Sequence, residues 1–139
     1  MRGETPNPKE RRVVLDTNVL VSAFLTPNGH PHTIVQAVLD SELVLAYSDA
    51  IMAEYRSVLA RPRFGFDAQD VSDVLAFIET FGEYTSITPS ETPMLDESDR
   101  PFLDTGEAAN ATLVTGNAKH YPPSDRLMAP AEFVRTQLT

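Results

Sequence analysis

The sequence predicts an α/β protein, a three-layer α/β/α arrangement around a central, mostly parallel, twisted sheet. Two observations support this prediction. Short apolar runs rich in β-branched residues, typical of buried strands, alternate with longer segments whose apolar residues recur at helical spacing. This alternation indicates crossover connections between parallel strands, with helices covering both faces of the sheet. The length of 139 residues and the hydrophobic content of 42% suit one domain with a buried core.

The expected domain begins after a short tail. Residues 1–10 carry two prolines and no hydrophobic periodicity, so we expect a flexible tail there and a single domain over residues 11–139. The tail has charged residues but no apolar segment, which argues against a secretory signal.

The first part of the domain shows two strand signals separated by helical segments. The β-branched run Arg12–Asp16 predicts a buried strand, and Val19–Leu25 predicts a helix directly after it. Proline and an Asn-Gly pair predict a turn at Thr26–Gly29. Apolar residues on one helical face predict a second helix over His32–Asp40. The run Leu43–Tyr47 predicts a second buried strand.

Two helices are expected in the middle of the chain. The first covers Asp49–Ala60, with polar residues able to cap its start and a proline soon after its end. Asp67 caps the second, in which apolar residues recur at three- and four-residue spacing as far as Phe81. Tyr84–Thr88 is a candidate third strand, and a loop rich in proline follows it.

The last third of the chain repeats the pattern of helix and strand. Ser98 or Asp99 starts a helix with Pro101 in its first turn, where a missing N–H costs little. The remaining expected elements are a strand over Ala111–Thr115, a short strand over Arg126–Met128 and a closing helix over Pro130–Leu138.

Composition excludes several classes of protein. The longest apolar stretch, Val19–Leu25, is too short to cross a bilayer, so we expect no membrane association. The chain has no cysteine, which excludes disulfides and thiolate metal sites and fits a cytoplasmic location.

The net charge of -9 limits any nucleic-acid function. Nucleic-acid binding depends on neutralising phosphates, and an acidic protein does this poorly. A nucleic-acid site on this chain would therefore need a local basic patch or a bound cation. The plainer interpretation is that the acidity provides solubility.

Asp16 is the first candidate site residue. It lies at the end of a buried strand, where α/β sheets bind ligands, and a carboxylate there must be compensated by a cation or by hydrogen bonds. We interpret it as a metal ligand. The alternative is that it caps the following helix, although Thr17 and Asn18 could do so equally well.

Two further acids are candidates because of the helix face they occupy. Glu54 flanks the apolar stripe of its helix, although an exposed surface glutamate is the commoner case. Asp99 lies on the same face as Phe102, whereas Asp104 points away and is expected to be a solvated charge. Acids at a helix start can also serve as caps. Asp96 and Glu97 can only support the site from the preceding loop.

The sequence Thr115-Gly116-Asn117 follows a strand in the same way as Asp16-Thr17-Asn18, although it could be a plain turn. Three carboxylates from a strand end, a helix flank and a helix start could converge at one edge of the sheet. Oxygen ligands alone suit Mg²⁺ or Mn²⁺, and no histidine pair has the spacing of a zinc site.

Four segments occur in a recognisable order and cover nearly the whole chain from Arg12 onward. They are VVLDTNVLVSAFL, SDAIMAEYRSVLARPRF, DESDRPFLDTGEAANATLVTGNAKHYP and MAPAEFVRTQL. In this order of motifs the chain resembles PIN-domain ribonucleases, and more narrowly the toxin-like PIN proteins of bacterial toxin–antitoxin systems.

The resemblance implies catalytic, metal-binding acids at Asp16, Glu54 and Asp99. Relatives often carry a fourth acid where this chain has Asn117, so one bound metal is the safer expectation. The positions that hydrogen-bond the site are Thr17, Asn18 and Thr115, with Asn117 as a further supporting residue.

The expected function is therefore a Mg²⁺- or Mn²⁺-dependent endoribonuclease, the toxin of a toxin–antitoxin pair. Its partners would be an RNA substrate, a cognate antitoxin protein and a second copy in a homodimer. The residues that could hold the RNA backbone are Arg56, Arg61, Arg63, Lys119 and His120.

Two alternatives remain at this point. A catalytically degraded PIN-like domain could act only as a protein- or RNA-binding module, and Asn117 keeps this alternative open. An aspartyl phosphatase-like hydrolase also begins with an apolar strand and an aspartate. It needs a second aspartate two residues after Asp16, where this chain has Asn18.

Overall fold

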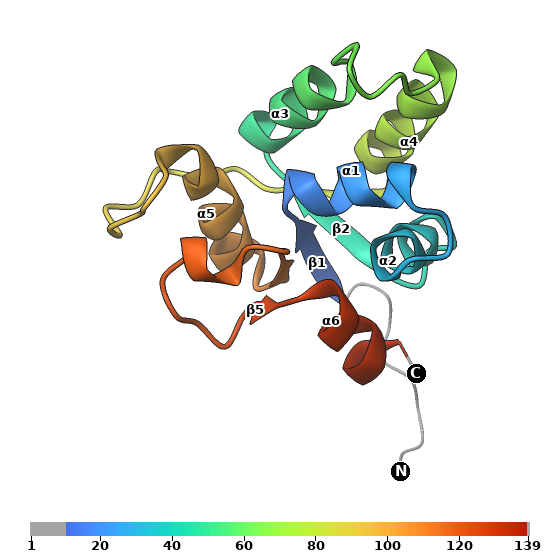
Figure 1. Cartoon of the computed structure of the whole chain (residues 1–139). Helices are drawn as coiled ribbons and strands as arrows, with labels where there is room; N and C mark the ends of the chain where they lie inside the picture. The colour runs from blue at the N-terminus through green and yellow to red at the C-terminus, as the bar shows by residue number, and fades with distance from the viewer. Residues whose placement is uncertain (1–10, 139) are drawn as a thin grey trace.

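Five strands form one sheet in the order β3-β2-β1-β4-β5 within residues 11–138, the part of the chain that this computed structural model describes (Figure 1). The strands are β1 (Arg12–Leu15), β2 (Val44–Tyr47), β3 (Glu83–Tyr84), β4 (Thr112–Val114) and β5 (Leu127–Met128). The expected flexible tail, residues 1–10, lies outside this range, and the single domain over residues 11–139 stays a prediction.

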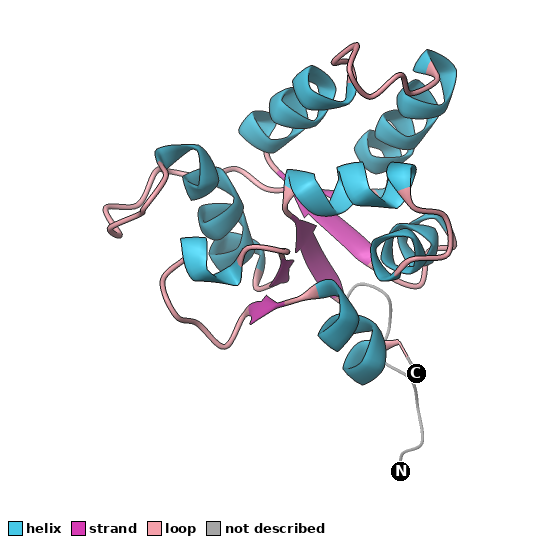
Figure 2. Cartoon of the chain, in the orientation of Figure 1, coloured by secondary structure: helices cyan, strands magenta, loops and turns pink. Residues whose placement is uncertain are grey.

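Six α-helices surround the sheet in the described residues (Figure 2). They are α1 (Thr17–Leu25), α2 (His30–Leu39), α3 (Asp49–Leu59), α4 (Ala68–Phe81), α5 (Arg100–Ala109) and α6 (Pro130–Gln137). Two short 3₁₀ turns, η2 (Glu97–Asp99) and η3 (Ala118–His120), precede α5 and follow β4. No helix in this part of the chain is long and apolar enough to span a membrane.

The predicted fold class is confirmed, because all four strand pairs are parallel. Helix α5 packs against β1, β2 and β4, on the side of the sheet opposite to α1 and α2 (Figure 1). The carboxyl ends of the strands consequently lie along one edge, where β1, β2 and β4 lead into polar residues.

The core lies between the central strand and the helices on either side of it. Val14 and Leu15 of β1 are fully buried. The ring of Tyr55 from α3 lies 6.4 Å from that of Phe102 on α5, and its hydroxyl donates to the Leu15 carbonyl oxygen at 2.6 Å. This bond fixes α3 against the carboxyl end of β1, where the candidate site begins.

The third strand is shorter than predicted and begins one residue earlier. It covers Glu83–Tyr84 instead of Tyr84–Thr88. The Thr85 N–H still donates to the Tyr47 carbonyl oxygen at 2.7 Å. The predicted cap of α4 is confirmed, since Asp67 accepts a hydrogen bond from the Asp70 N–H at 2.9 Å.

The prediction that Asp104 is a solvated charge is wrong. Its side chain is only 6% exposed, and Oδ2 accepts a hydrogen bond from the Ser90 N–H at 3.0 Å. The loop before α5 folds back over the face of the helix that turns away from the sheet. The guanidinium of Arg100 holds the same loop by donating to the Ser90 carbonyl oxygen at 2.7 Å.

Candidate active site

The candidate site is built where β1 and β4 end side by side. Leu15 pairs with Val114 in register, and the Asp16 N–H donates to the Val114 carbonyl oxygen at 3.0 Å. This bond aligns Asp16 with Thr115, the next residue of the neighbouring strand. Thr115 Oγ1 then donates to Asp16 Oδ2 at 2.8 Å. Parallel pairing thus places two residues from distant parts of the chain in contact.

Asp16 is buried but only half satisfied by hydrogen bonds. It is 7% exposed, and its Oδ2 accepts a second hydrogen bond from the Tyr121 hydroxyl at 3.1 Å. It stands at the N-terminus of α1 without making a side-chain cap bond, so the capping alternative is wrong. Within residues 11–138 no donor reaches its other oxygen, Oδ1. A buried carboxylate oxygen without a donor is well suited to a cation.

Glu54 is connected to the same region through α1. Its Oε2 accepts a hydrogen bond from the hydroxyl of Thr17, the first residue of α1. The Glu54 side chain is partly buried at the flank of α3, as the helical face predicted. The contact holds the carboxylate at the start of α1, whose first residue follows Asp16 in the sequence.

Asp99 completes the acidic cluster, which we define as Asp16, Glu54 and Asp99. Burial and then the negative charge of Asp16 raise the pKa of Asp99 to about 6. The charges of Asp96 and Glu54 add to this shift, and His120 opposes it, with its Nδ1 4.0 Å from Asp99 Oδ2. The three carboxylates therefore repel one another in the absence of a counter-charge.

The acidic cluster suits a divalent cation by the chemistry of its donors, but it is not a closed shell of ligands. Among the described residues, no group of three or more acids or histidines is spaced to hold a metal ion. Mg²⁺ commonly binds through one or two carboxylates and completes its shell with waters and substrate phosphates. Asp16 and Asp99, with the free oxygen of the first and the raised pKa of the second, fit this kind of binding.

The predicted supporting residues lie around β4 and α1. Asn18 Oδ1 accepts a long hydrogen bond, 3.5 Å, from the Gly116 N–H. Asn117 contributes its backbone N–H, which donates to Thr115 Oγ1 at 3.0 Å, and its side chain is exposed. The strand-end segments that start at Asp16 and Thr115 are thus joined to each other directly.

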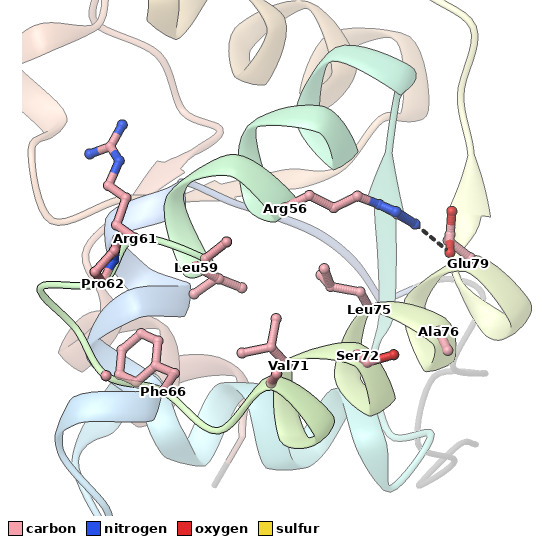
Figure 3. A pocket seen from close by; sticks show the side chains of 13 residues that line it. Arg56, Leu59, Arg61, Pro62, Phe66, Val71, Ser72, Leu75, Ala76 and Glu79 are labelled. Carbon is pink, nitrogen blue, oxygen red and sulfur yellow. Dashed lines mark ion pairs between the residues drawn. The ribbon is translucent and has the colours of Figure 1, made fainter.

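The five predicted cationic residues divide into three locations. Arg61 and Arg63 line a groove of about 760 Å³ that also includes Thr17 and Glu54. Arg56 lies elsewhere, beside a cavity between α3 and α4, and forms an ion pair with Glu79 at 2.7 Å (Figure 3). Lys119 and His120 are exposed on η3, next to Asp99.

Tyr121 is the site residue that sequence analysis missed. It is only 5% exposed, and burial, together with the charges of Asp16 and Asp99, raises the pKa of its hydroxyl far above the usual value. It therefore remains a protonated hydrogen-bond donor. In the sequence it stands just before a double proline that suggests only a turn, in a segment without helical or strand periodicity.

Comparison with known proteins gives two matches. Residues 12–119 match the model of a PIN-domain family, from the first strand to η3. An uncharacterized protein of the archaeon Methanocaldococcus jannaschii is 27% identical to this chain over 109 residues, covering 76% of this chain and 70% of the relative. PIN domains are generally nucleases and usually use divalent metals.

Proposed function

We propose, since this chain belongs to the PIN-domain family, that it is a Mg²⁺- or Mn²⁺-dependent endoribonuclease and the toxin of a toxin–antitoxin pair. The observation that carries the nuclease proposal is the buried carboxylate of Asp16. Two hydroxyl groups donate to one of its oxygens, and no donor within residues 11–138 reaches the other.

In this proposal Asp16 and Asp99 hold the metal, and Glu54 stands beside them at the edge of the groove. When bound, the cation would stabilise negative charge on the phosphodiester and favour deprotonation of a water. Thr115 and Tyr121 orient Asp16 through its Oδ2. The hydroxyl of Thr17 orients Glu54 by donating to its Oε2. Asp99 binds a cation in its ionised form, and its pKa in the metal-free protein is about 6, so metal affinity should fall as the pH drops through 6.

The test is cleavage of single-stranded RNA with and without Mg²⁺ or Mn²⁺. We expect the wild type to cleave, and Asp16→Asn, Glu54→Gln and Asp99→Asn to lose activity. The matched control is Asp125→Asn, which removes the same charge from an exposed turn. Chelation with EDTA should stop the wild-type reaction. Equal cleavage by the wild type and all three site variants would overturn this assignment of the site.

The toxin role needs a test in cells. We expect induction of the wild-type protein to arrest bacterial growth, induction of Asp16→Asn to be harmless, and co-expression of a cognate antitoxin to restore growth. Such an antitoxin would place a basic side chain against the acidic cluster. If cells grow normally although the protein cleaves RNA in vitro, the nuclease proposal stands and the toxin role is rejected. A homodimer is also proposed, and a sedimentation mass of one chain at micromolar concentration would contradict it.

A binding module is the second candidate, favoured by two observations. No three acids or histidines among the described residues are spaced for a metal ion, and Asn117 brings no charge to the corner where relatives often carry an acid. This candidate predicts RNA or protein binding with no cleavage and no effect of Mg²⁺ on thermal stability. Metal-dependent cleavage that requires Asp16 would exclude it.

A further inference from the structure

A stack of aromatic rings lies beside the groove and has no role in the site described above. Phe64 and Phe66 are parallel, with ring centroids 5.2 Å apart and an interplanar angle of 6°. Phe24 of α1 packs against Phe66 with ring centroids 5.1 Å apart and an interplanar angle of 34°. The guanidinium of Arg63 lies over the Phe64 ring, 4.8 Å from its centroid. We call Phe24, Phe66, Phe64 and Arg63 the aromatic column.

The column ends in a groove that one acid of the cluster, Glu54, also lines. Arg63 and Phe64 line the groove together with Thr17 and Glu54. On α3 the groove-lining residues recur from Glu54 at helical spacing, so they form one continuous face. The axial distance from Glu54 to the end of α3 is about 8 Å. A nucleic acid whose scissile phosphate lies at the acidic cluster would place its next nucleotides at the end of the column, where Arg63 covers Phe64.

The arginines of this groove differ from three arginines that lie elsewhere on the protein. Within the described residues, neither Arg61 nor Arg63 forms an ion pair with an acid, whereas Arg56, Arg12 and Arg100 pair with glutamates at 2.7–2.9 Å. Arg61 lines both this groove and the cavity between α3 and α4, and in Figure 3 its guanidinium points away from the other labelled residues of that cavity. The groove therefore offers positive charge to a ligand on a protein whose net charge is -9.

We propose that the aromatic column is a base-stacking subsite for single-stranded RNA, with Arg61 as its phosphate-binding residue. The proposal rests on the proposed nuclease function and names the form of its substrate. Aromatic rings and guanidinium planes stack on unpaired bases, and a duplex hides these faces. A partly exposed ring held by a parallel neighbour loses little freedom on binding. The column is therefore preorganised for stacking.

Binding of fluorescein-labelled RNA of about 12 nucleotides, followed by anisotropy in Mg²⁺, tests the stacking residue. The protein carries Asp99→Asn so that the RNA is not cleaved. We expect the single strand to bind at least about tenfold more tightly than the same strand annealed to its complement. Phe64→Ala should weaken single-strand binding by about tenfold. The control is Phe81→Ala, which removes an aromatic ring that is 64% exposed on α4 and should change nothing.

The dependence of binding on salt separates stacking from charge. Each phosphate contact contributes about 0.7 to the slope of log affinity against log salt for a single strand. We expect Arg61→Gln to lower the slope by about that amount, and Phe64→Ala to leave the slope unchanged. Arg126→Gln, outside the groove, is the charge-matched control. Circular dichroism and thermal melting of each variant confirm that it is folded.

Three results would overturn the column as a base-stacking subsite. They are equal affinity for single strand and duplex, unchanged affinity in folded Phe64→Ala, and no binding of the single strand at low salt. The nuclease proposal is tested separately, by RNA cleavage with a protein whose acidic cluster is intact. A protein that cleaves RNA but binds it equally with and without Phe64 would retain the function and lose this inference.

Discussion

At the scale of single residues, Tyr121 offers a test of positioning, because its hydroxyl reaches Asp16 at 3.1 Å and touches no other acid of the cluster by hydrogen bond. Tyr121→Phe keeps the buried ring and removes this donor. We expect metal affinity or cleavage to fall by about 10–100-fold, the usual cost of losing a group that orients a metal ligand.

The matched control for this prediction is Tyr84→Phe. It removes a tyrosine hydroxyl that donates to Asp49 at 2.9 Å, outside the acidic cluster. Titration of Mg²⁺ against cleavage rate gives both affinity and maximal rate. Equal losses in the two variants would show that Tyr121 acts only through general stability.

The raised pKa of Asp99 predicts that the stability of the protein depends on pH. In the metal-free protein its pKa is raised to about 6, from 3.8, so the folded state binds this proton more tightly than the unfolded state. The resulting stabilisation is present below about pH 4 and is lost as pH rises through 6. Asp99→Asn removes the effect. Between pH 4 and 7, the free energy of unfolding of Asp99→Asn should therefore increase relative to that of the wild type by about 1 kcal/mol. The effect is this small because solvent screens the partly exposed carboxylate of the wild type.

Urea unfolding in EDTA at several pH values measures this difference. Asp125→Asn, in an exposed turn, should show no such trend. A wild type that gains stability relative to Asp99→Asn as pH rises would contradict the predicted sign.

Sequence alone could place some site residues better than others. Asp16 was predictable because a strand end is visible as the end of an apolar run, and helical spacing correctly put Glu54 on the flank of its helix. Tyr121 was not predictable, since its contact depends on how the segment after β4 folds back. Asp104 was misjudged because a helix-face argument assumes solvent opposite the core, and here the loop at Ser90 covers that face.

At the scale of elements, the junction between α4 and β3 depends on the absence of a side chain at Gly82. A Cβ there would lie 2.5 Å from the Ile78 carbonyl oxygen and 2.7 Å from the Leu45 carbonyl oxygen, both backbone atoms. We expect Gly82→Ala to lower the free energy of unfolding by about 1–3 kcal/mol, the range for overpacking.

Gly106→Ala is the control in a helix interior. Its Cβ would meet only ordinary contacts, 3.7 Å from the Ala111 carbonyl oxygen and 3.9 Å from Leu113 Cβ. Because alanine favours helix over glycine, we expect a gain of about 0.5–1 kcal/mol. Urea unfolding of both variants measures the effects. A higher free energy of unfolding in Gly82→Ala would contradict the predicted clash of its Cβ with the two carbonyl oxygens.

The predicted elements correspond closely to those observed, with differences at their ends. The helix predicted over Asp49–Ala60 is observed as Asp49–Leu59, because apolar periodicity and a following proline define it well. The strand predicted over Tyr84–Thr88 shrinks to Glu83–Tyr84. A short edge strand is set by its neighbour's backbone, which the local pattern of residues does not reveal.

At the scale of the whole molecule, the net charge of -9 and the acidic cluster predict that divalent cations stabilise the fold. We expect Mg²⁺ to raise the melting temperature, since binding to the folded state alone adds about 2.7 kcal/mol at 100 times the dissociation constant. Asp16→Asn should lose most of this increase. NaCl at matched ionic strength is the control, and an equal shift with NaCl would show screening instead of binding.

The layered architecture was predictable from the alternation of strands and helices, but the order of strands was not. Nothing local in the sequence states that β4 pairs with β1 instead of β3. That pairing places Thr115 against Asp16, so the candidate site is a product of topology as much as of its acidic residues.

The contacts of Asp16 with Thr115 and Tyr121 span 99 and 105 positions of the chain. All three acids of the cluster are synthesised before either hydroxyl donor. A nascent chain, or a product of interrupted translation ending at β4, thus carries the acids without the arrangement that orients them. In the proposed ribonuclease, the site that orients Asp16 is therefore incomplete until translation has passed Tyr121.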